Sequence, residues 1–221
     1  MSLKQIFTEP INRSKTYYIL DNIFSAITHG IGFGLAVAGL VILIIRAASS
    51  GSPIRIVAFT LYGSSLVLLY LFSTLYHSLI FTKANKVFQI FDHTSIFILI
   101  AGSYIPYTLV AIGGKKGWWM FGLITILAVI GILYYILIPG NHIIFDTILY
   151  VAMGWLVIFA STTLYSVLGK TGFWLLVWGG IAYTIGAILY CLRRIPFIHV
   201  IWHLFVMLGS ILMYFSILLY V

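Results

Sequence analysis

The sequence predicts an all-α integral membrane protein, a bundle of seven transmembrane helices that forms a single domain over residues 1–221. Its residues are 62% hydrophobic and 7% charged, far from the balance of an ordinary soluble domain. Apolar runs of about 20 residues or more, the length that crosses a hydrocarbon core, recur along the whole chain. Only short loops separate these runs, and no loop is long enough to form a second domain.

Each apolar run ends at a short segment rich in residues that interrupt helices. In chain order these segments are ASSGSP, FTKANK, GGKKG, PGNH, GKTG and RRIP. The runs between them cover residues 22–46, 54–81, 88–112, 117–138, 143–167, 171–192 and 197–221. Pro106 lies inside the third run, so we expect a kink in that helix.

The basic residues predict the orientation of the bundle. Seven crossings place the two ends of the chain on opposite sides of the membrane. The N-terminal side would carry Lys4, Arg13, Lys15, Lys83, Lys86, Arg193 and Arg194, and the other side Arg46, Arg55, Lys115, Lys116 and Lys170. We therefore expect a short cytoplasmic segment over residues 1–21, without a secretory signal peptide, and a C-terminus outside the cell.

The net charge of +8 does not indicate a nucleic-acid partner, because the basic residues are scattered among loops and form no stripe. We expect these residues to meet lipid phosphates and to set the topology. The sequence does not fix an oligomeric state.

The histidines and intramembrane carboxylates gather at one side of the predicted bundle. They lie at helix ends that the parity of the crossings assigns to the N-terminal side: His29, His77, Asp92, His93, His142, Asp146, His199 and His203. Ionisable residues inside a membrane are by default candidates for a functional site. This clustering therefore points to a site near that face.

The spacing of these residues favours a metal site. His199 and His203 are four residues apart and project from one helical face, as do Ser73 and His77 in the second run. Three neutral histidines with one position left for water are typical of catalytic zinc. Asp92 would offset the charge of Zn²⁺ and accept a proton from its water, whose pKa zinc lowers to about 7. Ser73 would donate a hydrogen bond to the water or to an oxyanion.

Less specific explanations exist for each of these residues. A histidine pair such as that in HVIWH also forms hydrogen bonds between packed helices, and a transmembrane serine often bonds its own helix backbone. His29 can hold a ligand histidine or Asp92 in position by a hydrogen bond, or it can simply belong to a polar face at the start of its helix. We expect His93 and His142 to be interfacial.

The combination of Ser73-x-x-x-His77, Asp92 and His199-x-x-x-His203 resembles the bacterial hemolysin III family. That family belongs with the progestin and adiponectin receptors and more remotely with alkaline ceramidases. The stretches SAITHGIGFGL and FDHTSIFILIAGSYIPYTL extend the resemblance over nearly the whole chain. The resemblance implies zinc held by His77, His199 and His203, near the cytoplasmic side, with Asp92 reaching the metal through water and Ser73 beside it.

Two functions follow from these residues. The first is a zinc-dependent hydrolase that acts on an amide or ester of a membrane lipid, as some ceramidase relatives do. The second is a zinc site without catalysis, in a membrane-homeostasis, receptor-like or cytolytic protein. A transporter is disfavoured because the acidic and histidine residues lie at one membrane face and define no continuous polar path. The sequence does not identify the lipid.

Overall fold

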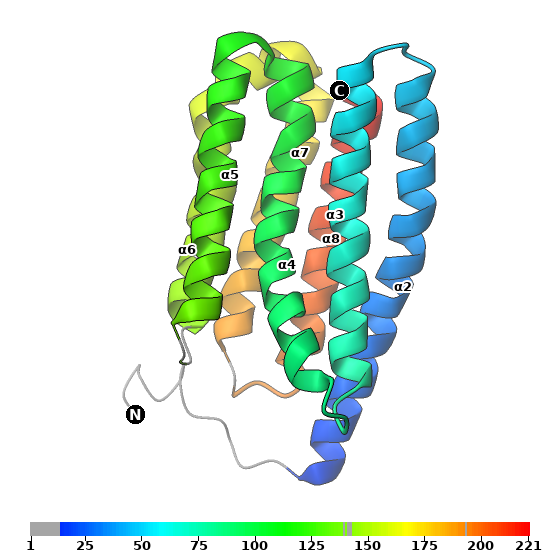
Figure 1. Cartoon of the computed structure of the whole chain (residues 1–221), viewed down its shortest axis with the longest axis vertical. Coiled ribbons are helices and arrows are strands. Elements are labelled where there is room, and N and C mark those ends of the chain that lie inside the picture. The colour runs from blue at the N-terminus through cyan, green and yellow to red at the C-terminus, as the bar shows by residue number, and fades with distance from the viewer. Residues whose placement is uncertain (1–13, 139, 141–142, 193) are drawn as a thin grey trace.

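The computed structural model describes residues 14–138, 140, 143–192 and 194–221, and their regular secondary structure is helical throughout. The helices lie side by side along the long axis of one bundle (Figure 1). The elements are α2 (Lys15–Ala48), α3 (Pro53–Ser78), α4 (Asn85–Ile105), η1 (Pro106–Ile112), α5 (Gly114–Leu137), α6 (Ile143–Trp155), η2 (Leu156–Ala160), α7 (Ser161–Cys191) and α8 (Ile198–Tyr220).

Six helical stretches in the described chain are long and apolar enough to cross a membrane. These are Lys15–Ala48, Pro53–Ser78, Asn85–Ile112, Gly114–Leu137, Ile143–Cys191 and Ile198–Tyr220. Large apolar side chains are exposed along α2 and α5, as expected for helices that face lipid tails. The protein is therefore an all-α membrane protein, as the sequence predicts.

The stretch Ile143–Cys191 is 49 residues long, about twice the length that one crossing needs. At Gly169 the backbone departs from helical geometry, with φ 66° and ψ 178°. Glycine adopts this conformation readily because it has no Cβ. The break falls within the predicted GKTG interruption, so the sequence located it correctly.

The helix α2 begins at Lys15, seven residues before the predicted start of the first run at residue 22. Ser14 caps it, and its hydroxyl accepts a hydrogen bond from the backbone N–H of Tyr17. The expected segment 1–21 is thus helical from Lys15 onward. Residues 1–13 lie outside the described part of the chain.

The helix over the third predicted run does not end at Pro106. Pro106 begins a seven-residue π-helix, η1, that follows α4 directly. Proline removes a backbone donor and displaces the preceding turn, so the wider π turn is a physical consequence of its position. The two elements together cover Asn85–Ile112.

The packing brings four helix ends to one end of the bundle. The helix α3 packs against α2 and α4, while α8 packs against α2 and α7. The last turn of α3 lies near the first turns of α2, α4 and α8 (Figure 1). Val221 lies at the opposite end, where its carbonyl accepts a hydrogen bond of 2.7 Å from Arg55 near the start of α3.

Candidate metal centre

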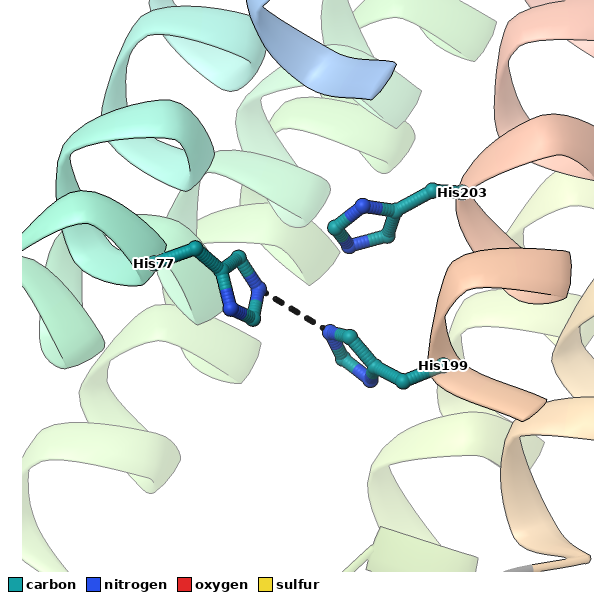
Figure 2. A group of neighbouring side chains, drawn as sticks. All are labelled: His77, His199 and His203. Carbon is teal, nitrogen blue, oxygen red and sulfur yellow. Dashed lines mark hydrogen bonds between the residues drawn. The ribbon is translucent and has the colours of Figure 1, made fainter. Parts of the chain in front are cut away.

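Three histidine rings converge between α3 and α8 (Figure 2). His77 lies in the last turn of α3, and His199 and His203 lie in the first two turns of α8. One ring nitrogen from each residue lies within 4.8 Å of the other two. The Nε2 atoms of His77 and His199 are 3.0 Å apart. The predicted convergence of these three imidazoles is confirmed.

The side chain of Asn22 fixes the ring of His77 from α2. The Asn22 amide nitrogen donates to the Tyr18 carbonyl at 2.8 Å, which leaves the amide oxygen as an acceptor. This oxygen lies 2.9 Å from Nδ1 of His77, so Nδ1 carries the hydrogen. In the neutral ring, Nε2 then presents a lone pair toward the other histidines.

His203 is held in the same way by the backbone of α2. Its Nδ1 lies 3.3 Å from the carbonyl oxygen of Ser25, an acceptor that requires a donated N–H. The Nε2 atom of His203 is therefore also left with a lone pair. In both rings Nδ1 is thus hydrogen-bonded to α2 and Nε2 is available to a ligand, the arrangement that metal-binding histidines generally show.

The spacing of the rings fits a metal ion. Two imidazole nitrogens bound to one tetrahedral zinc ion lie about 3.3 Å apart, given Zn–N distances of about 2.0–2.1 Å. The observed separations, 3.0 Å for one pair and at most 4.8 Å within the group, reach this value with small side-chain shifts. His77 and His203 are 6% and 1% exposed, so an ion here would be largely shielded from solvent.

A small cavity of about 40 Å³ adjoins the histidines. Ser73 and Asp92 line it together with His199 and His203. Ser73 is 1% exposed, and its hydroxyl has no hydrogen-bond partner within the described chain, although it is near enough to Asp92 to interact with its carboxylate. The five residues singled out in the sequence therefore share one site or its wall.

The cavity also includes two residues of the polar cluster to which the sequence analysis gave no role at the metal. His93, which we expected to be interfacial, lines this cavity beside Asp92. Its Nδ1 lies 2.9 Å from the Gln89 carbonyl, one turn back along α4, and 3.8 Å from the Asp92 carboxylate. Asp146 is buried in the cavity wall. His142 lies outside the described residues.

The start of α8 is anchored to α2. Phe197, two residues before His199, has φ 54° and ψ 21°, a left-handed conformation that is strained for a residue with a bulky side chain. The hydroxyl of Tyr17 accepts a hydrogen bond of 2.7 Å from the Phe197 N–H, and the two rings lie 4.9 Å apart. These contacts hold the first turn of α8, and with it His199, in place.

Sequence reasoning missed Asn22 and Tyr17. A polar residue near the start of an apolar run has many explanations, and its partner, His77, lies 55 residues away. The available signal was the burial of an uncharged amide in the membrane, which requires hydrogen-bond partners. That signal indicates a contact but does not say with which residue.

Comparison with known proteins finds a family that covers most of the chain. Residues 17–214 match the family model described as Haemolysin-III related. The chain is 46% identical to Hemolysin-3 of Bacillus cereus over 97% of both chains. It is 45% identical to the Hemolysin-3 homolog of Bacillus subtilis, over 92% of this chain and 96% of the relative. The human Monocyte to macrophage differentiation factor is 28% identical over 71% of this chain and 67% of its own length.

The match therefore covers nearly the whole bundle, from the first turn of α2 to Tyr214 in α8. The apolar helices and these bacterial relatives together identify a multi-pass protein of the bacterial cell membrane. The chain belongs to the hemolysin III family.

Proposed function

We propose that the protein is a zinc-dependent hydrolase that cleaves an amide or ester bond of a membrane lipid. The observation that carries the proposal is the orientation of the histidine nitrogens. His77 and His203 turn their unprotonated Nε2 atoms toward His199, beside a cavity that Ser73 and Asp92 line. This combination of three imidazoles, one carboxylate and an adjoining space resembles an open catalytic zinc site more than a closed structural one.

Zinc suits this donor set better than a hard cation such as Mg²⁺ or Ca²⁺, which prefers oxygen ligands. His77, His199 and His203 would hold the ion through their ring nitrogens. When bound, zinc would polarise a carbonyl group and make a water molecule acidic enough to react at neutral pH. Asp92 supports this assignment because its negatively charged carboxylate would balance the charge of a divalent cation inside an apolar bundle.

The side chains in the cavity have complementary roles in this reaction. Asp92 accepts the proton of the attacking water, as a general base. Ser73 donates its hydroxyl hydrogen to the carbonyl oxygen, on which negative charge develops. The hydroxyl makes no well-formed hydrogen bond within the described chain and lies beside the Asp92 carboxylate, where the reacting carbonyl group would be.

A lipid substrate fits the surroundings of the site. A second cavity of about 90 Å³ lies next to the first. The two cavities share a mainly apolar wall: Leu69, Ile96, Tyr150, Ala187, Trp202 and Val206. An acyl chain in the deeper cavity would leave its carbonyl group beside the histidines.

We also propose that the chain crosses the membrane seven times, with its N-terminus in the cytoplasm. The break at Gly169 supports two crossings within Ile143–Cys191. The start of α2 and the end of α8 lie at opposite ends of the bundle, which supports an odd number of crossings (Figure 1). The site then faces the cytoplasmic side.

A non-catalytic role is the second candidate, because two relatives carry the name Hemolysin-3 and a bound metal can stabilise a fold without reacting. In that case the ion would tie α3 to α8 and the protein would act in membrane homeostasis, in reception or in cell lysis. Variants that separate metal binding from turnover distinguish the two candidates.

We predict that His77→Ala abolishes both zinc binding and lipid hydrolysis, because one of three ligands is lost. Asp92→Asn should keep the zinc and lower turnover by about 10²–10⁴-fold, since the amide cannot act as a base. The measurements are metal content by mass spectrometry and hydrolysis of a panel of lipid amides and esters by protein in nanodiscs. Full hydrolysis by His77→Ala, or no hydrolysis of any panel lipid by the zinc-loaded wild type, would contradict the proposal.

We predict that Asn22→Leu weakens zinc binding by about 10–100-fold, the usual effect of removing a hydrogen bond behind a ligand histidine. The substitution keeps the size of the side chain and removes the acceptor for Nδ1 of His77. The matched control is Asn85→Leu, which removes an asparagine that bonds the Tyr76 carbonyl instead. Chelator competition measures both affinities, and equal affinities in the two variants would contradict the role of Asn22.

We predict the topology from labelling of single cysteines in a Cys191→Ala background. Gly51→Cys, between α2 and α3, and a cysteine added after Val221 should react with a membrane-impermeant maleimide on intact cells. Lys83→Cys, between α3 and α4, should react only after permeabilisation. Labelling of the C-terminal cysteine and of Lys83→Cys from the same side would rule out seven crossings.

A further inference from the structure

His29 is a fourth imidazole at the site, and its nitrogens make no well-formed hydrogen bond within the described chain, although the backbone of His203 lies near the ring. It lies on α2, lines the same cavity as Ser73 and Asp92, and is 3% exposed. A buried donor without a hydrogen bond costs free energy, so such groups in folded proteins usually meet a ligand or water. The metal-ligand group formed by the other three histidines does not include His29.

The ring of His29 is fixed on two sides. It stacks on His203, with 3.5 Å between ring centroids and 12° between planes. The ring of Tyr70 meets it edge-on at 5.0 Å and 89°. Stacking alone would be served equally well by phenylalanine, which has no nitrogen atoms to bury. The nitrogens of His29 therefore need an explanation of their own.

The neighbouring His93 provides a contrast. It lines the same cavity, but its Nδ1 donates to the Gln89 carbonyl and its Nε2 lies 3.5 Å from the Tyr190 hydroxyl. His29, in contrast, reaches the cavity from α2 with ring nitrogens that make no well-formed hydrogen bond in the described chain, and Ser73 reaches it from α3 beside Asp92. The cavity of about 40 Å³ has room for about three water-sized groups, so a ligand inside it would meet both walls.

We propose that His29 binds substrate directly, by donating a ring N–H to the carbonyl oxygen of the lipid amide or ester and to the carboxylate oxygen of the acyl product. With Ser73 it forms a pair of donors, supplied by two different helices, for a single oxygen atom. This inference rests on the proposed hydrolase function. It assigns His29 to the ligand oxygen and not to the metal.

The test measures binding of a product-like carboxylate without relying on turnover. Hexanoate labelled with ¹³C at its carboxyl carbon is titrated into protein in nanodiscs, and binding is followed by NMR. We expect His29→Phe, which keeps the stacked ring and loses both nitrogens, to weaken binding by about tenfold or more while zinc content stays unchanged. His29→Gln, which keeps an N–H donor, should stay within about threefold of the wild type.

The control is His29→Gln, because it changes the same position and keeps an N–H donor, and so separates loss of the donor from any other effect of the substitution. If His29→Phe does not fold, His29→Met replaces it, because methionine also lacks an N–H donor. Unchanged affinity in the variant, loss of zinc together with affinity, or no hexanoate binding by the wild type would overturn the role of His29. If hexanoate binds the wild type and the variants as expected but the wild type hydrolyses no lipid, only the proposed hydrolase function is overturned.

Discussion

The rest of the site depends on the hydrogen bonds that His77 and His203 donate through Nδ1 to acceptors on α2. Asn22 and the Ser25 carbonyl determine which nitrogen of His77 and of His203 carries hydrogen, and so where the lone pairs point. Tyr17 holds the first turn of α8 through Phe197. The helix α2 thus acts as a rigid frame behind the site, which explains why it begins before the apolar run and carries buried polar groups.

A polar site in an apolar bundle also explains the distribution of charge. The chain has only four acidic residues, and two of them, Asp92 and Asp146, line the cavity beside the histidines. Buried carboxylates are costly in such surroundings unless positive charge or hydrogen-bond donors lie near them, and Asp92 lies beside His93 and Ser73. The apolar cavity beside it shares six lining residues with this site and would suit a lipid chain in the proposed function. A single proposed site would therefore hold the metal ion, the carboxylate that balances its charge and the lipid substrate.

The sequence was informative where a single helix or apolar run determines the structure. Runs and breakers located the described helices closely, including the break at Gly169, and helical periodicity placed His199 and His203 on one face. Prediction from the sequence failed where the structure depends on contacts between segments that are far apart in the chain. The hydrogen bonds of His77 and His203 to α2 join residues 55 and 178 positions apart, and no local pattern specifies them. The early start of α2 was missed because Asp21 and Asn22 separate its first turns from the long apolar run that follows.

The central claim is that these imidazoles bind zinc. Its most direct test is the metal content of freshly purified protein, measured by mass spectrometry for the wild type beside His203→Ala. We expect about one zinc ion per chain in the wild type and its loss in the variant. A wild-type protein that carries no metal and takes up none when zinc is supplied would contradict it, and the converging histidines would then be part of ordinary helix packing.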